Sequence, residues 1–291
     1  MDTFAFQALG THWTISLDGA TFSAATKEYI LGFLRTFESR FSRFIPESEV
    51  NAFRSASAGT FPVSPEFALL LARAQQLREW TRGAFDPAVA SVLERAGYDR
   101  ALSLSPKESE GDTRVPAWSL SGGLLTIEGP IAFDLGGIGK GYAIDRVADI
   151  LRADGCVYFL VEGGGDMVGT TKADGSGWRV AVAWPGKEVG TIASVVTLQN
   201  QGFAASDTLL RRWGKWHHII DMRTQTPVET LIGAAVIAPE AFAADVMTSA
   251  LFLLPQEEAP AVLGLFGATA MTFAADGSVS VDSKWSGEIF V

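Results

Sequence analysis

The spacing of hydrophobic and polar residues along the chain predicts a mixture of helices and strands. Apolar residues recur at helical spacing over residues 24–40 and 65–80, and Pro65 after the capping residue Ser64 marks the start of the second helix. Residues 4–17 alternate between apolar and polar as in a single strand. Further segments with a strand pattern lie at 178–183, 190–198, 216–221 and 231–238, and a hairpin that turns at Asp276-Gly277 is expected within 271–291.

These elements predict the α+β class, with mixed sheets flanked by helices and a substantial antiparallel component. The sequence contains no internal repeat and no clear linker, so residues 1–291 are expected to form a single domain with two lobes. Residues 103–123 are rich in Ser, Gly, Pro and charged residues, which is typical of surface loops. We expect a variable surface insertion there.

A glycine-rich loop follows the apolar run 131–133. The run ends in Asp134, the loop continues to Gly141, and a helical pattern begins directly afterwards and stops at Gly155. Residues 157–161 then read as a buried strand that enters a second glycine loop, 163–166. Because backbone N–H groups at a loop-to-helix junction attract anions, this βαβ-sized unit is a candidate phosphate site. Tight packing of a strand against a helix is the alternative.

The first glycine loop does not match either common nucleotide motif. A Walker loop needs a glycine where Asp134 stands and a hydroxyl residue where Gly141 stands. The dinucleotide-binding pattern fails because Tyr142 occupies the place of its third glycine. A phosphate site here would therefore belong to another class of fold.

Composition narrows the classes of function. The chain is 47% hydrophobic and 19% charged, as in a well-packed enzyme, and its formal charge of −10 argues against nucleic acid as a partner. A small phosphorylated ligand remains compatible with that charge. Cys156 is the only cysteine, which excludes intrachain disulfides and cysteine-based zinc sites, and we expect it to be a small core residue.

The chain has no apolar run of the length that crosses a membrane, so we expect no membrane span. Its first ten residues lack the basic region and apolar stretch of an export signal. A cytoplasmic location is therefore expected for the chain as given, or a periplasmic one if a signal has been removed.

The helical segment after Pro239 is almost entirely apolar, and Asp245 lies in its middle. Ser249 follows one turn later on the same face. A buried carboxylate needs a partner, and carboxylate and hydroxyl oxygens are ligands that suit Mg²⁺. The alternative is that Asp245 caps another segment or pairs with an arginine. Two adjacent histidines, His217 and His218, are expected on opposite faces of one strand.

Taken together, these features resemble a known family, the ApbE-like FAD:protein FMN transferases. The motifs occur along the whole chain in the order seen in that family: Gly10-Thr11, Phe41-Ser-Arg-Phe with Ser48-Glu, Phe85-Asp-Pro87, Asp134 to Asp145, Gly164-Gly-Asp166, His217-His-Ile-Ile-Asp221 and Ala244 to Ala250. The resemblance implies Mg²⁺-dependent transfer of FMN from FAD to a Thr or Ser hydroxyl of an acceptor protein, with release of AMP. FAD would be the substrate and the acceptor protein the partner.

The resemblance also implies roles for individual residues. Asp245 and Ser249 match the side-chain metal ligands, and Gly139 falls where the family has a backbone carbonyl ligand. The implied catalytic residues are Lys140, near the nucleotide phosphates, His218, beside the reaction centre, and Asp245. The residues expected to bind the nucleotide are Gly10, Thr11, Phe85, Asp86, Asp134, Gly137, Ile138, Lys140, Gly141, Asp145, Gly165, Asp166, Ser206, His218 and Asp221.

The chain departs from the family pattern in two places. Ser206-Asp-Thr-Leu209 replaces a common Ser-Gly-x-Tyr segment, and Asp221-Met-Arg-Thr-Gln225 replaces a common Asp-Pro-x-Thr-Gly segment. Both changes concern acceptor transfer more than binding of FAD or metal. The alternatives are therefore an FAD pyrophosphatase that yields FMN and AMP, and a non-catalytic FAD-binding protein.

Overall fold

The computed structural model describes residues 1–107 and 114–290. Contacts divide the chain into two units. Unit 1 comprises Met1–Thr36, Ile138–Leu210 and Glu229–Val291, and unit 2 comprises Phe37–Gly137 and Arg211–Val228. Helix α1 (Ala24–Phe41) begins in unit 1 and ends in unit 2.

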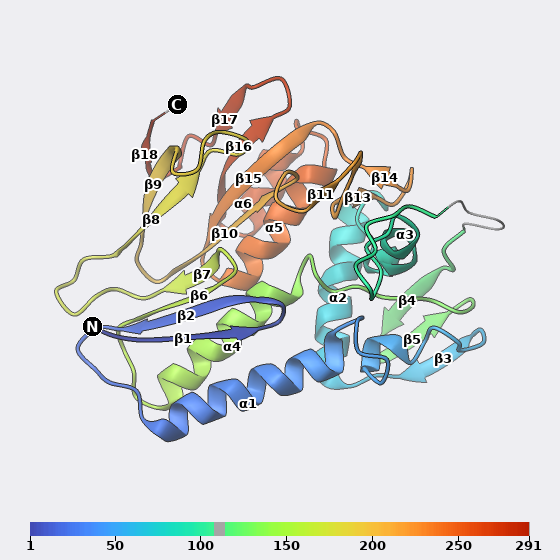
Figure 1. The fold of residues 1–291 in the computed structure, drawn as a ribbon, viewed down its shortest axis with the longest axis horizontal. Helices are drawn as coiled ribbons and strands as arrows, with labels where there is room; N and C mark the ends of the chain where they lie inside the picture. The colour runs from blue at the N-terminus through green and yellow to red at the C-terminus, as the bar shows by residue number, and fades with distance from the viewer. Residues whose placement is uncertain (108–113, 291) are drawn as a thin grey trace. The chain divides into compact units, whose positions relative to one another are not determined.

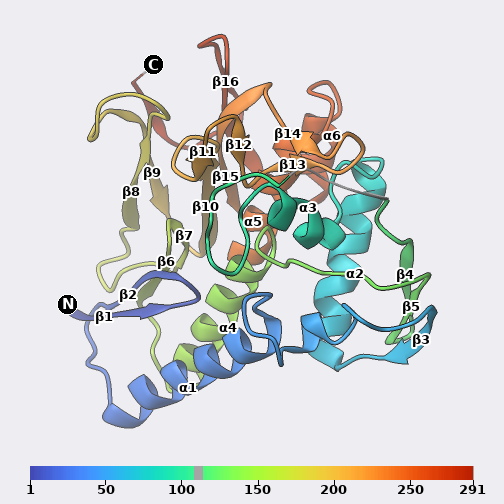
Figure 2. The same cartoon turned by 45° about the vertical axis from the view of Figure 1, so that its right-hand side comes forward.

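Unit 1 is built on an eight-stranded sheet (Figures 1 and 2). Its strands, in spatial order, are β1 (Asp2–Ala8), β2 (Thr11–Leu17), β6 (Phe159–Gly163), β7 (Asp166–Gly169), β10 (Gln201–Asp207), β15 (Leu231–Ala238), β16 (Thr269–Ala274) and β17 (Val279–Val281). Every neighbouring pair in this sheet is antiparallel. The turn predicted at Asp276-Gly277 connects β16 to β17, as expected.

Two long helices of unit 1 pack against each other and against this sheet. Helix α4 (Gly139–Ala153) contacts β6 and β7, and helix α5 (Ala241–Leu253) contacts β10 and β15 (Figure 1). A short helix, α6 (Ala259–Leu265), lies against α5 and β16. This arrangement buries almost the whole of α5, as its apolar sequence requires.

A second, three-stranded sheet of unit 1 consists of β18 (Glu288–Ile289), β9 (Ile192–Leu198) and β8 (Trp178–Ala183). Its buried side chains form one core cluster with residues of β10, β15 and β16. Strands β8 and β9 lie where the sequence pattern predicts them.

Unit 2 contains helix α2 (Pro65–Trp80), helix α3 (Ala90–Arg95) and the 3₁₀ helices η1 (Glu49–Asn51) and η2 (Pro87–Val89). Its three-stranded sheet has the order β3 (Gly59–Pro62), β5 (Leu124–Ile127), β4 (Trp118–Ser121). Two small antiparallel ladders complete it: β11 (Arg212–Trp213) with β12 (Trp216–His217), and β13 (Ile220–Asp221) with β14 (Thr226–Pro227).

The core of unit 2 is aromatic. The Phe133 ring meets the rings of Phe53, Phe67 and Trp118 edge-on, with centroids 5.6–6.1 Å apart. Such edge-to-face pairs stabilise a fold by about 0.5–1.5 kcal/mol each beyond the burial of their surface. The cluster fixes the chain immediately before Asp134.

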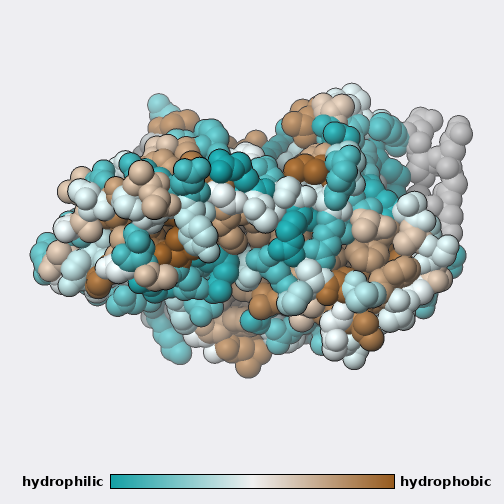
Figure 3. Space-filling view, turned by 90° about the horizontal axis from the view of Figure 1, so that it is seen from below, coloured by the Kyte–Doolittle hydropathy of each residue, from teal (hydrophilic) through white to brown (hydrophobic). Residues whose placement is uncertain are grey.

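The predicted α+β class is confirmed, and so are the helices expected at 24–40 and 65–80. The Ser64 hydroxyl accepts a hydrogen bond from the Phe67 amide and caps α2 as the sequence suggests. On the face in Figure 3, hydrophobic and hydrophilic residues are interspersed. No helix of the described residues is long and apolar enough to cross a membrane.

Three predicted strands need correction. Residues 4–17 form a hairpin because Leu9 and Gly10 both adopt positive φ (51° and 70°), the pattern of a type I′ turn. Residues 216–221 form β12 and β13, which pair with different partners. Residues 131–133 form no strand, so the βαβ unit does not exist and β6 pairs antiparallel with β2 and β7.

The insertion predicted at 103–123 stays a prediction. Residues 108–113 lie outside the described part, and Trp118–Ser121 form β4. The single-domain prediction likewise stays a prediction.

Candidate functional site

A side chain from α5 caps the N-terminus of α4. Asp245 is buried, and its Oδ2 accepts a hydrogen bond from the Gly141 amide at 2.8 Å. Gly141 lies so close to α5 that an added Cβ would meet the Ala241 carbonyl oxygen at 2.5 Å. Asp245 therefore caps another segment, the alternative left open by the sequence, and Gly141 serves close helix packing.

Asp145 on α4 caps α5 in return. Its two carboxylate oxygens accept hydrogen bonds from the amides of Ala241 (3.0 Å) and Phe242 (2.8 Å). Burial raises the pKa of Asp145 to about 6, although these two amides favour the charged form. Asp145, predicted to bind the nucleotide, has this structural role in unit 1.

Lys140 and Asp166 form an ion pair beside Asp245. Asp166 begins β7 and is buried, its Oδ2 contacts the Lys140 ammonium, and its Oδ1 accepts from the Ala205 amide at 3.3 Å. Burial raises the pKa of Asp166, the nearby Asp245 charge raises it further, and Lys140 opposes both. The Lys140 ammonium thus faces the Asp166 carboxyl group at the start of α4, and Asp245 lies nearby.

Ser249 and Gly139, the other predicted metal ligands, belong to the same helix pair. Ser249 lies one turn after Asp245 on α5 and is half-buried, and Gly139 is the first residue of α4. Among the described residues, no three His, Cys, Asp or Glu side chains are grouped so that they could hold a metal ion. A cation in unit 1 would thus have at most two such side chains as ligands, together with hydroxyl and carbonyl oxygens.

The turn of the β1–β2 hairpin lies against the second glycine loop. The Gly164 amide donates to the His12 carbonyl at 3.0 Å, and an added Cβ on Gly164 would meet the Thr11 hydroxyl at 2.6 Å. Gly165 donates its amide to Glu162 Oε1 at 2.9 Å. The fold thus brings Thr11 next to Gly164, the residue before Gly165. Ser206 lies near the end of β10 and follows Ala205, whose amide donates to Asp166.

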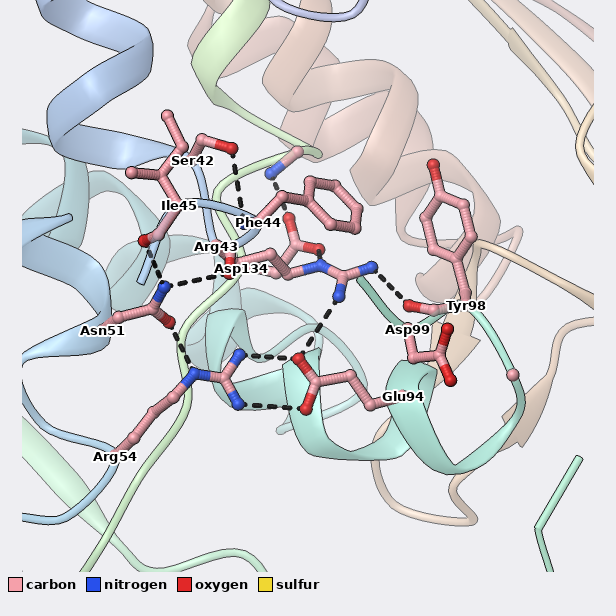
Figure 4. Close-up of polar contacts among 12 residues, drawn as sticks. Ser42, Arg43, Phe44, Ile45, Asn51, Arg54, Glu94, Tyr98, Asp99 and Asp134 are labelled. Atoms are coloured by element: carbon pink, nitrogen blue, oxygen red, sulfur yellow. Dashed lines mark hydrogen bonds and ion pairs between the residues drawn. The ribbon is translucent and has the colours of Figure 1, made fainter. Parts of the chain in front are cut away.

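In unit 2, Asp134 is held by a buried arginine (Figure 4). Arg43 donates from Nε to Asp134 Oδ2 at 2.6 Å and from Nη2 to the Tyr98 carbonyl at 2.7 Å. The other carboxylate oxygen, Oδ1, accepts from the Gly136 amide at 2.6 Å and shapes the glycine loop up to Gly137. Sequence analysis missed this role of Arg43, because its partners lie 55 and 91 positions away.

The cluster around Arg43 extends to a second arginine. Glu94 accepts two hydrogen bonds from Arg54, at 2.9 and 2.6 Å, and lies 3.4 Å from Arg43 (Figure 4). Asn51 bridges the two arginines, because its amide group donates to the Arg43 carbonyl and its Oδ1 accepts from Arg54 Nε. The basic and acidic groups of the cluster thereby satisfy one another.

Asp86 has a local structural role in unit 2. It caps η2 through the Ala88 amide (2.9 Å), accepts from the Trp118 indole (2.9 Å) and pairs with Arg78. Burial raises its pKa, while these partners act in the opposite direction. Phe85, half-buried beside it, donates its amide to the Thr81 hydroxyl.

The two histidines differ in environment, as expected from their alternation. His217 is buried, with Nε2 2.8 Å from the Val228 carbonyl, whereas His218 is half-buried. Asp221 accepts three side-chain hydrogen bonds from Arg223. Partial burial raises the pKa of Asp221, but the hydrogen bonds and charge of Arg223 outweigh this effect and lower it. The predicted site residues thus fall into one group in unit 1 and another in unit 2.

Comparison with known proteins identifies relatives over nearly the whole length. A family model described as the ApbE family matches residues 9–272. Proteins named FAD:protein FMN transferase are similar to this chain: that of Escherichia coli K12 is 27% identical over 93% of this chain and 83% of its own length, and that of Haemophilus influenzae is 27% identical over 87% and 80%.

Solved structures share the fold. The flavin transferase ApbE from Vibrio cholerae has a TM-score of 0.80 at 22% identity and covers 97% of this chain and 96% of its own. The ApbE protein of Thermotoga maritima has a TM-score of 0.81 at 23% identity, with the same coverage. At this identity the likeness establishes the fold.

Proposed function

The chain belongs to the ApbE family, and from this premise we propose that it transfers FMN from FAD to a threonine or serine hydroxyl of an acceptor protein, releasing AMP, with Mg²⁺ as cofactor. The transferase class follows from the family and from its curated relatives, which are named FAD:protein FMN transferase. The Mg²⁺ requirement and the acceptor hydroxyl are our additions.

The observation that carries the proposal is the set of hydrogen-bond partners of the Asp245 carboxylate. One of its carboxylate oxygens accepts from the Gly141 amide, and the structure records no hydrogen bond to the other among the described residues. An ionised carboxylate so deep in an apolar helix is costly unless it has further partners. The residues present fit Mg²⁺, which prefers oxygen ligands and takes few from the protein.

We assign the metal to Asp245, Ser249 and the Gly139 carbonyl. Bound there, Mg²⁺ would neutralise charge on the FAD pyrophosphate. Lys140 would supply a further positive charge beside the phosphates, held in place by its pair with Asp166. In the reaction, the acceptor oxygen forms a bond to the flavin-side phosphorus, the bond to the AMP oxygen breaks, and the acceptor hydroxyl loses its proton.

For unit 2, the assignments of Phe85, Asp86, Asp134, His218 and Asp221 stay predictions from the family resemblance. His218 is the residue of this group that would accept the hydroxyl proton, because a neutral imidazole has a nitrogen that accepts protons. Gly10, Thr11, Gly165 and Ser206 stay nucleotide-binding predictions in unit 1.

Incubation of the protein with FAD, Mg²⁺ and a candidate acceptor domain tests the proposal. Covalent flavin on the acceptor, seen as fluorescence of the denatured acceptor band and as the added mass of FMN, is the expected result. Failure of any acceptor to be labelled, with free FMN and AMP accumulating, would identify an FAD pyrophosphatase. Retention of intact FAD would identify a binding protein.

The pyrophosphatase is the second candidate because of Arg223. This residue stands within the departure from the common Asp-Pro-x-Thr-Gly pattern, and its guanidinium donates to both carboxylate oxygens of Asp221. If Asp221 contributes to acceptor placement, Arg223→Ala should raise the ratio of transfer to hydrolysis. An unchanged ratio would remove this reason for the second candidate.

A further inference from the structure

The net charge of the chain is unevenly distributed. Unit 1 contains 9 Lys and Arg against 19 Asp and Glu, whereas unit 2 contains 14 of each. The excess of ten negative charges therefore belongs entirely to unit 1. Any concentration of positive charge in unit 2 stands out against this background.

Such a concentration occurs at the β11–β12 hairpin. Residues 211–218 contain Arg211, Arg212 and Lys215 and no acidic residue, and all three cations are exposed. The described residues provide no carboxylate partner for them. Arg212 Nε donates to the Gly214 carbonyl at 3.3 Å, and Lys215 Nζ lies 5.9 Å from the Trp216 ring.

Several other arginines of unit 2 pair with carboxylates. Arg40, Arg54, Arg78 and Arg223 each contact a carboxylate at 3.1 Å or closer. The three hairpin cations are thus available to an external anion, in contrast to these four arginines.

The hairpin that carries these cations is firmly anchored. Trp213 is buried, donates its indole N–H to the Ala96 carbonyl at 2.7 Å and stacks on Tyr98 with ring centroids 5.5 Å apart. Gly214 has a φ of +56° and makes the tight turn between paired Trp213 and Trp216. A rigid platform loses little entropy when a ligand binds.

The hairpin also leads directly into the proposed reaction-centre histidine. Strand β12 ends at His217, and His218 follows. Three residues of extended chain span at most about 10 Å, so Lys215 lies within that distance of His218. An anionic group held by the hairpin would therefore lie close to the residue proposed to take the acceptor proton.

We propose that Arg211, Arg212 and Lys215 form a docking surface for an acidic segment of the acceptor protein. The inference rests on the proposed function, since it assigns acceptor recognition to that activity. Guanidinium groups bind carboxylates through paired N–H donors, which suits Asp and Glu side chains. An extended anionic surface such as a membrane would be repelled by the ten excess negative charges of the same chain, whereas a short acidic segment approaches only the hairpin.

A binding experiment tests the surface without requiring turnover. A fluorescent twelve-residue peptide with one threonine and six Asp or Glu residues is titrated with the protein, and compared with the peptide carrying Asn and Gln instead. We expect the acidic peptide alone to bind, and to bind roughly tenfold more weakly to the R211E/R212E/K215E variant. Its affinity should also fall steeply with salt.

The matched control is R35E/K187E/K284E, which changes the net charge equally at exposed positions of unit 1. It should bind the acidic peptide like the unaltered protein. Equal loss of binding in both variants would mean that net charge alone attracts the peptide and would overturn the proposal. Equal binding of both peptides would overturn it as well. Thermal unfolding midpoints of both variants check that the fold is kept.

Activity assays separate the two proposals. With an acceptor domain that the unaltered protein labels, the hairpin variant should raise the acceptor KM and leave the KM for FAD unchanged. A rise in the KM for FAD instead would assign the cations to the nucleotide phosphates and overturn the inference. Binding of the protein to phosphatidylserine vesicles, but not to the acidic peptide, would assign them to a membrane. Complete absence of flavin transfer would contradict the proposed function and leave the peptide result standing.

Discussion

Asp145 and Asp245 each close the N-terminal turn of the other's helix. Asp145 on α4 accepts from the first two amides of α5, and Asp245 on α5 accepts from the Gly141 amide of α4. A carboxylate at a helix N-terminus satisfies free N–H groups and interacts favourably with the helix dipole. The two helices are therefore joined by reciprocal capping hydrogen bonds as well as by apolar contacts.

Asp245→Asn should separate the capping role of this residue from its proposed role at the metal. The Asn carbonyl can still accept from Gly141, so the free energy of unfolding should fall by only about 1 kcal/mol. Mg²⁺-dependent FAD cleavage should fall on the order of a hundredfold or more, because the charged ligand is lost. Asp149→Asn, at a half-buried position of α4, is the control. Normal turnover by Asp245→Asn, measured by release of AMP, would refute the metal assignment.

Asp145 should make stability depend on pH between about 4 and 6. Its pKa is raised from 3.8 to about 6, so the folded state binds the proton more tightly than the unfolded chain. The contribution of this group is most favourable below pH 4 and is lost as the pH rises through 6, by at most about 3 kcal/mol.

Urea unfolding of the protein and of Asp145→Asn across this range checks the sign. The difference in unfolding free energy, variant minus unaltered protein, should increase as the pH rises from 4 to 6.5. A difference that stays flat or decreases would contradict the raised pKa.

Gly141→Ala should destabilise the protein by about 1–3 kcal/mol, through overpacking between α4 and α5. The added Cβ would meet the Ala241 carbonyl oxygen at 2.5 Å and the Asp245 Cβ at 2.7 Å. Gly32→Ala in α1 is the matched control, because a Cβ there meets nothing within 4 Å. That change should stabilise by about 0.5–1 kcal/mol. Denaturant midpoints for both variants decide the question, and similar stability of the two would show that α4 can move away from α5.

Arg43→Met should lower the free energy of unfolding by about 3 kcal/mol or more, because it leaves the Asp134 carboxylate without its buried cation. Arg43→Lys should recover only part of that loss, since an ammonium group cannot reach Asp134 and the Tyr98 carbonyl in the same fork geometry. Arg100→Lys, at an exposed position, should change little. Calorimetric melting of the three variants measures their stabilities, which should increase from Arg43→Met to Arg43→Lys to Arg100→Lys. Equal stability of the two Arg43 variants would contradict this prediction.

Local signals predicted much of the fold. Ser64 and Pro65 mark the start of α2 through contacts within four residues, and the apolar pattern of α5 reveals the burial of Asp245. The β1–β2 turn was missed because Leu9, a residue that gives no turn signal, adopts a positive φ there. Residues 131–133 look like a strand because they are buried. Their burial comes instead from the aromatic core, with the Ile131 amide donating to the Phe53 carbonyl.

The candidate site was predictable in its residue types and not in its pairings. Asp245 and Gly141 are 104 positions apart, and Lys140 and Asp166 belong to different elements. Periodicity places a residue on a helix face, but only tertiary packing decides which amide or ammonium group that face meets. The assignment of these residues to one candidate site came from the family motifs and not from the spacing of residues along the chain.

The place of β1 and β2 in the eight-stranded sheet also has a consequence for synthesis on the ribosome. The hairpin is complete at residue 17, but its sheet neighbour β6 ends at residue 163. At about 5–20 residues per second, roughly 7–30 s separate the two during translation. An isolated hairpin is marginally stable in water. Residues 37–137 of unit 2 emerge within that interval. This unit can therefore begin to fold before β6, the strand that pairs with β2, has been synthesised.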